Sequence, residues 1–166
     1  MAEKSQGNGA YQLITPPNLL KAKVGKGGMS GIDPELIKRA EGVIDTMGDD
    51  FADSVTIEIT RLMQLAMDLE DDPSKAEKVL KKARRIGHDL RGQGATYGYD
   101  LISDVASSLY RYAERLYSFA ELNPDVLRAH ADAMRAVIKN QVKGDGGEVG
   151  IDLVKSLDSL VEQMAG

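Results

Sequence analysis

Apolar residues in this chain recur every three or four positions from about residue 33 almost to the C-terminal end. That spacing gathers apolar side chains on one face of an α-helix. Turn-forming residues interrupt the pattern and divide it into six expected helices, at about residues 33–48, 50–70, 74–97, 100–119, 123–142 and 150–164. Alternating apolar and polar positions are scarce, and Leu, Ala, Lys and Glu are abundant, so we predict an all-α fold.

Capping residues indicate where several of these helices begin and end. Asp33 followed by Pro34 is typical of a helix start. Ser74, with Glu77 three residues later, predicts a capping box at the start of the third helix. Gly98 is expected to end that helix.

The connections after the second, third and fourth expected helices are only a few residues long. Short connections make consecutive helices antiparallel, so we predict an up-down-up-down four-helix bundle over about residues 50–142. The additional N-terminal and C-terminal helices would pack against its ends or sides. Residues 1–31 contain six glycines and two consecutive prolines, so we expect a flexible N-terminal arm before a helical domain at 32–166.

Composition narrows the possible functions. The chain has no cysteine, which excludes disulfides and thiolate chemistry and fits a reducing compartment. It shows no signal peptide and no apolar run long enough to span a membrane, so we expect a cytoplasmic protein that does not bind membranes. Its net charge of −5 does not favour nucleic-acid binding, and we expect none.

The third expected helix carries a histidine on its polar face. On a helical wheel His88 lies opposite the apolar stripe of that helix, which comprises Val79, Ala83, Ile86 and Leu90. We therefore expect His88 to be exposed. Five residues are predicted to share its side of the helix: Lys81, Arg84, Arg91, Gly92 and Ala95.

Three glycines lie within this one helix, and each costs about 1 kcal/mol relative to alanine. Gly87 and Gly94 border the apolar stripe, where a small residue would let a neighbouring helix approach closely. Gly92 lies beside His88 on the exposed face, where packing inside the bundle cannot explain it. We interpret Gly92 as a place where the backbone of a partner protein comes close to the histidine.

The arrangement of His88, Arg91, Gly92 and Gly98 resembles the motif of histidine-containing phosphotransfer (HPt) domains in bacterial-type two-component phosphorelays. That motif reads H-x-x-[KR]-G, with a further glycine ten residues after the histidine, and its third position is apolar, as Leu90 is here. The resemblance covers about residues 50–142. Two departures are the arginine at 91, where lysine is commoner, and Gln93, where a small residue is commoner.

The resemblance implies that His88 carries a phosphoryl group between aspartates of receiver domains, or from a hybrid sensor histidine kinase to a response regulator. Arg91 would stabilise the charge of the phosphoryl group. The receiver would supply Mg²⁺, so the chain itself needs no cofactor or metal and has no kinase activity of its own. We expect a monomer.

The charge around the histidine suits an acidic partner of this kind. Residues 75–91 contain seven basic side chains against two acidic ones, in a protein that is acidic overall. Such a patch can accelerate association with an acidic surface. The predicted docking residues are Lys81, Arg84, Arg85, Gly92 and Ala95.

Two alternatives stay open at this point. The sequence from His88 to Arg91 also resembles the start of sensor-kinase dimerisation helices, although Gly92 and Gln93 replace the expected Thr or Asn and Pro. A dimeric, kinase-like histidine phosphotransferase is therefore one alternative. A helical adaptor without covalent chemistry is the other, and it predicts that His88 can be replaced without loss of function.

Two further expectations concern Tyr110 and His130. Tyr110, on the fourth expected helix, would lie level with His88 and could hydrogen-bond the ring nitrogen that does not carry phosphate. His130 falls within the apolar pattern of the fifth expected helix, so we interpret it as a partly buried structural residue.

Overall fold

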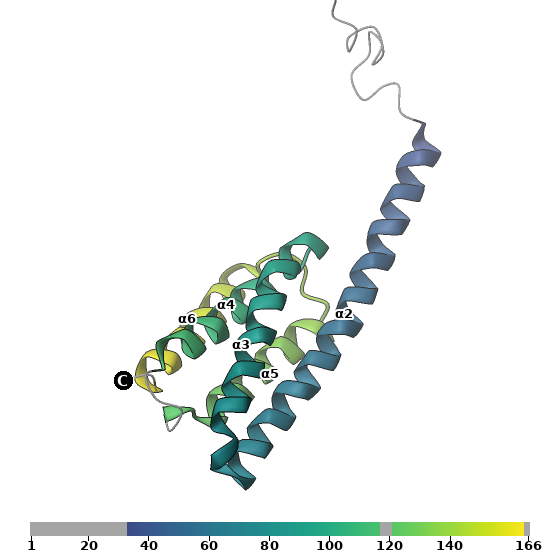
Figure 1. Cartoon of the computed structure of the whole chain (residues 1–166). Coiled ribbons are helices and arrows are strands. Elements are labelled where there is room, and N and C mark those ends of the chain that lie inside the picture. The colour runs from purple at the N-terminus through teal and green to yellow at the C-terminus, as the bar shows by residue number, and fades with distance from the viewer. Residues whose placement is uncertain (1–32, 117–120, 165–166) are drawn as a thin grey trace, which may run out of the picture. The chain divides into compact units, whose positions relative to one another are not determined.

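The structure is a computed structural model that describes residues 33–116 and 121–164. Within these ranges the chain forms five α-helices and short 3-10 segments, with no strand, which confirms the all-α prediction. Figure 1 shows the helices along the chain. The predicted flexible arm at 1–31 lies outside the described residues.

The first helix, α2, runs without interruption from Pro34 to Asp71. The prediction of two helices separated near residue 48 was therefore wrong. Gly48 is buried within α2, and a Cβ there would lie 3.0 Å from the Nζ atom of Lys143. A single glycine costs a helix only about 1 kcal/mol, which the packing of α2 can offset. The start was predicted correctly, since Asp33 Oδ1 accepts a hydrogen bond from the backbone N–H of Glu35 at 3.0 Å.

The apolar stripe of α2 is buried along only part of the helix. From Phe51 to Leu69 its members lie in the hydrophobic core. Before Gly48 the large apolar side chains are exposed: Leu36, Ile37, Val43, Ile44 and Met47.

The helix that carries His88 is α3, from Ala76 to Gln93. A 3-10 turn, η2 (Pro73–Lys75), precedes it, and a second one, η3 (Gly94–Tyr97), continues it. The capping box at Ser74 was not found: the carboxylate of Asp72 accepts hydrogen bonds from the backbone N–H and the hydroxyl of Ser74 instead. The turn starts at Pro73, so the preceding residue, Asp72, is the N-cap whose side chain accepts from the free N–H groups. Gly98 ends the segment in the left-handed conformation with φ 74°, as predicted.

Three helices complete the structure: α4 (Asp100–Arg115), α5 (Pro124–Lys139) and α6 (Gly147–Met164). The predicted end of the fourth helix at residue 119 falls outside the described residues. Asn123 begins α5 as predicted, because its side chain accepts a hydrogen bond from the N–H of Asp125 at 2.8 Å. The N–H of Asn123 donates to the buried hydroxyl of Tyr112 at 2.7 Å, which fixes the start of α5 against α4.

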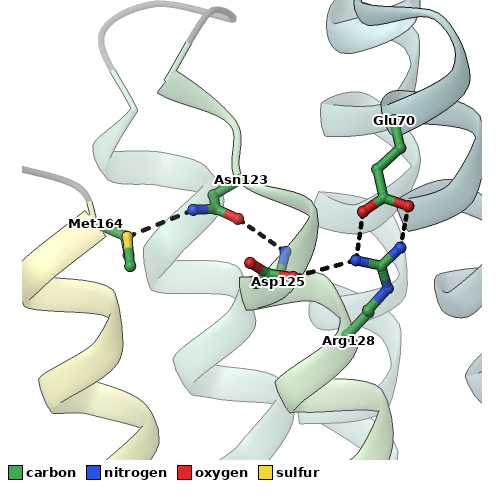
Figure 2. Close-up of polar contacts among 5 residues, drawn as sticks. All are labelled: Glu70, Asn123, Asp125, Arg128 and Met164. Carbon is green, nitrogen blue, oxygen red and sulfur yellow. Dashed lines mark hydrogen bonds and ion pairs between the residues drawn. The ribbon is translucent and has the colours of Figure 1, made fainter.

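Helix α4 contacts α3, α5 and α6, and α5 also contacts α6. Figure 2 shows the polar contacts at one end of α5. Arg128 forms a two-pronged ion pair with Glu70 of α2, and Asn123 donates to the sulfur of Met164 on α6 at 3.4 Å. All the candidate site residues lie in one compact unit, Glu41–Gly166. None of the described helices has both the length and the apolar composition needed to cross a membrane.

Candidate functional site

His88 lies on the exposed face of α3, with 62% of its side chain accessible. The opposite face of the helix is buried in the core, as predicted, through Val79, Ala83, Ile86 and Leu90. The helical period alone therefore placed the histidine correctly. Its imidazole ring is open to a reagent or to a partner protein.

The carboxylate of Asp89 lies next to the imidazole of His88. Its Oδ1 atom lies 3.3 Å from Nδ1 of His88, and its Oδ2 atom lies 3.5 Å from Nε of Arg85. A carboxylate next to Nδ1 favours the tautomer in which Nδ1 carries the proton. The lone pair is then on Nε2, so Nε2 is the nucleophilic atom of this ring.

The ring of Tyr110, on α4, lies beside His88. The two ring centres are 5.9 Å apart and the planes are inclined by 56°. The predicted hydrogen bond from Tyr110 to His88 is not found, and the contact is between the rings. Arg84 lies near the same ring, with its guanidinium carbon 5.8 Å from the ring centre. Its interaction with Tyr110, with a smaller contribution from Glu114, raises the pKa of the guanidinium.

Gly87 is what allows α4 to come so near. A Cβ at this position would lie 3.1 Å from the carbonyl oxygen of Ala106 and 3.1 Å from the backbone nitrogen of Tyr110. Both are backbone atoms of α4, so a side chain on Gly87 would push that helix away. The prediction that this glycine serves helix packing is confirmed. Because Gly87 directly precedes His88, the close approach brings Tyr110 next to the histidine.

Gly92 and Gly98 differ from Gly87. A Cβ on Gly92 would meet nothing within 4 Å, and the residue is exposed, so packing within the described residues does not require a glycine here. At Gly98 the positive φ angle is the reason for glycine. Ala95 is also exposed, in η3, where its backbone N–H donates to Ser103 Oγ at 2.9 Å.

The predicted basic residues are exposed, but most are paired with carboxylates. Lys81 pairs with Glu77 at 2.5 Å, Arg84 pairs with Glu114 at 2.5 Å, and Arg85 pairs with Asp89. The sequence did not indicate that Glu114 of α4 would neutralise part of the patch, because that contact depends on how α3 and α4 pack.

Arg91 differs from the paired residues Lys81, Arg84 and Arg85. Among the described residues it makes no ion pair, and its guanidinium carbon lies 4.4 Å from the centre of the Tyr110 ring. It is one helical turn from His88. Its N–H donors remain available for an anion near the histidine.

A hollow of about 440 Å³ lies between α2 and α3, on the other side of His88 from Tyr110. Leu65 and Ile86 line its apolar part. Its charged rim has both signs: Glu58, Asp68 and Asp89 with Arg61, Lys82 and Arg85. Arg84 and Arg85 thus flank His88 on opposite sides, one toward α4 and one toward this hollow.

The second histidine, His130 on α5, is fully buried rather than partly buried as predicted. Its Nδ1 donates to the carbonyl oxygen of Val126 at 2.7 Å, and its Nε2 has no partner among the described residues. Nearby, Asp158 of α6 accepts hydrogen bonds from Ser108 and Arg111 of α4. His130 is therefore a structural residue in the interior and not part of the exposed site.

Burial lowers the pKa of His130 below its ordinary value of 6.5, and the nearby charges of Asp158 and Arg111 act in opposite directions. Above pH 6.5 the residue is neutral in both the folded and the unfolded chain. As the pH falls below that value, the unfolded chain binds a proton that the folded chain does not, so the folded state is destabilised until the pH passes the folded pKa. We expect the free energy of unfolding to fall by at most about 1.4 kcal/mol per pH unit in this window.

Denaturant unfolding at pH 7.5, 6.5 and 5.5 measures this effect. In a His130→Leu variant the histidine contribution to the pH dependence should be absent. An identical loss of stability in the native chain and the variant would show that another group is responsible.

Among the described residues, no three His, Asp or Glu side chains come together in a way that could hold a metal ion. No family model, curated protein or solved structure matches this chain.

Proposed function

We propose that this chain is a histidine phosphotransfer protein that carries a phosphoryl group on Nε2 of His88. The observation that carries the proposal is the combination of an exposed His88, its Nδ1 directed to Asp89, and a free Arg91 one turn away. In this proposal α3, α4, α5 and the part of α2 from Phe51 onward form an antiparallel four-helix bundle. The earlier part of α2 and the whole of α6 are additional to it.

The chemistry is a phosphoryl transfer from an aspartyl phosphate on a receiver domain. The Nε2 lone pair attacks phosphorus in line, the N–P bond forms, and the P–O bond to the aspartate breaks, which releases a carboxylate. The ring gains positive charge, because Nδ1 keeps its proton. The carboxylate of Asp89, 3.3 Å from Nδ1, stabilises that charge. Reversal of the step passes the group to another aspartate.

Arg91 is the second residue of the chain that acts in this reaction, because it can bind the phosphoryl group. Its guanidinium can donate two parallel hydrogen bonds to the phosphoryl oxygens. Because no carboxylate pairs with it among the described residues, its charge is not already neutralised. The Mg²⁺ ion and the acidic pocket would come from the receiver domain.

A labelling experiment tests the proposal. Receiver domains carrying a labelled aspartyl phosphate, together with Mg²⁺, are mixed with the full chain. We expect the label to move to the chain, to be labile in acid and stable in base, and to map by mass spectrometry to the peptide that contains His88. Failure of a broad set of receivers to transfer label, with a folded chain that still binds them, would overturn the proposal in favour of a non-catalytic adaptor.

The kinase-like alternative rests on one observation, the contact of Asp89 with His88, since an acidic neighbour can act as a base in autophosphorylation. Incubation of the chain alone with ATP and Mg²⁺ distinguishes the kinase-like alternative from the proposed phosphotransfer protein. The proposed phosphotransfer protein should take no label from ATP, whereas labelling of His88 by ATP without any added kinase would favour the alternative.

A Gly92→Ala substitution should separate docking from chemistry. The new methyl group meets nothing within the described residues, so the fold should be unchanged or more stable by up to about 1 kcal/mol. We expect transfer from a receiver domain to slow by about tenfold, because the methyl group projects toward the partner backbone next to His88. Phosphorylation by a small donor, phosphoramidate, should be unchanged. Equal receiver kinetics for the variant and the native chain would show that Gly92 does not face the partner.

A further inference from the structure

Arg91 is held in a different way from Lys81, Arg84 and Arg85, the three basic residues near His88 that form ion pairs. Lys81, Arg84 and Arg85 each contact a carboxylate, whereas Arg91 lies over the face of an aromatic ring. The distance from its guanidinium carbon to the centre of the Tyr110 ring is 4.4 Å, within the range of a cation–π contact.

The two kinds of contact have different consequences for anion binding. A carboxylate neutralises a guanidinium and occupies two of its N–H donors. An aromatic face attracts the cation through its quadrupole, leaves the charge in place, and leaves the N–H groups in the plane of the guanidinium free. An arginine held by a ring is therefore oriented in advance and still fully able to bind a phosphoryl group.

We propose that Tyr110 is a positioning residue that holds Arg91 beside His88 without neutralising it, so that the guanidinium is in place when the phosphoryl group arrives. This inference rests on the proposed phosphotransfer function and adds a residue on α4 to a site otherwise built from α3. Tyr110 also contacts the histidine ring itself, with ring centres 5.9 Å apart.

Two features of the structure keep Tyr110 in position. Gly87 lets the backbone of α4 approach α3 at Tyr110, as described above. Arg84 contacts the same ring, with its guanidinium carbon 5.8 Å from the ring centre, and Glu114 neutralises Arg84 at 2.5 Å. Because Arg84 is neutralised, the two guanidinium groups that share the ring repel each other less. Of the two arginines, Arg84 is neutralised by Glu114, whereas the positive charge of Arg91 is available to the phosphoryl group.

Phosphoramidate is the donor of choice for the test, since it phosphorylates a histidine without a partner protein and so removes any effect on docking. We expect Tyr110→Leu to lower the rate of His88 phosphorylation by about fivefold, the size of an exposed cation–π contact. Tyr110→Phe should retain most of the native rate, because phenylalanine has the same aromatic face. Arg91→Ala alone should lower the rate by about tenfold.

A double-mutant cycle separates positioning from a general structural effect. In the Arg91→Ala background, Tyr110→Leu should cause no further loss, because there is no longer a guanidinium to position. Thermal unfolding of each variant confirms that it is folded at the assay temperature. The positioning role would be overturned if Tyr110→Leu lowered the phosphorylation rate by the same factor in the native and the Arg91→Ala backgrounds. It would also be overturned if Tyr110→Leu alone had the native rate.

The outcomes for the two proposals differ. If phosphoramidate labels the native chain and Tyr110→Leu equally well while receivers transfer normally, only the positioning role is overturned. If neither phosphoramidate nor any receiver domain labels His88 of the native chain, both the positioning role and the phosphotransfer function are overturned.

Discussion

Replacement of His88 by glutamine is expected to abolish phosphoryl uptake, with a fall of about a thousandfold or more in the rate of labelling from a receiver domain. The glutamine amide has a similar size and polarity, but its nitrogen has no available lone pair and cannot form the phosphorus–nitrogen bond. The side chain of His88 is 62% exposed and lies opposite the buried face of α3. The fold should therefore be unaffected by the change.

Two measurements make this result specific. The thermal midpoint of His88→Gln should equal that of the native chain within about a degree, because surface substitutions of this kind change stability by less than about 0.5 kcal/mol. An Asp89→Asn variant is the matched control: it keeps the nucleophile and should slow transfer without abolishing it. Label retained on His88→Gln would place the phosphoryl group elsewhere and overturn the assignment of His88.

A Gly94→Ala substitution is expected to lower the stability of the fold strongly. The added Cβ would lie 2.5 Å from Ser103 Oγ, 2.7 Å from the carbonyl oxygen of Tyr99 and 2.8 Å from the backbone nitrogen of Ser103. Two of these are backbone atoms that cannot rotate away, so η3 and the start of α4 must separate. Overpacking of this kind costs about 3 kcal/mol, and we expect the free energy of unfolding to fall by about that amount.

Chemical denaturation of the two glycine variants side by side provides the comparison. Gly92→Ala, two residues earlier at the end of α3, adds an identical methyl group where nothing lies within 4 Å. It should be as stable as the native chain or slightly more stable. Equal stabilities for Gly94→Ala and Gly92→Ala would mean that the close contact at Gly94 is absent in solution.

The single glycine at position 48 shows where reasoning from sequence failed. Gly48 next to two aspartates looked like the end of a helix, yet α2 continues to Asp71. The local preference against glycine in a helix is small, about 1 kcal/mol. Burial of the apolar side chains that follow Gly48 in α2, from Phe51 to Leu69, outweighs it. Packing with residues distant in the sequence decided the outcome, and no local pattern could show it.

The site residues also divide into features that are local to one helix, which the sequence predicted, and contacts between helices, which it did not. The helical period placed His88 on the exposed face of α3 and Val79, Ala83, Ile86 and Leu90 in the core, because that relation is internal to one helix. The left-handed residue at Gly98 was also predictable, since the requirement is local.

By itself, then, the sequence determined the all-helical fold, the exposure of His88 and the closeness of Arg91 along the helix, because each follows from the geometry of a single helix. Only the tertiary structure decided which charges are neutralised and which arginine remains free. Glu114 reaches Arg84, and Tyr110 reaches Arg91, because Gly87 lets α4 lie against α3. Contacts of this kind depend on how two helices pack, and that information is distributed over both of them.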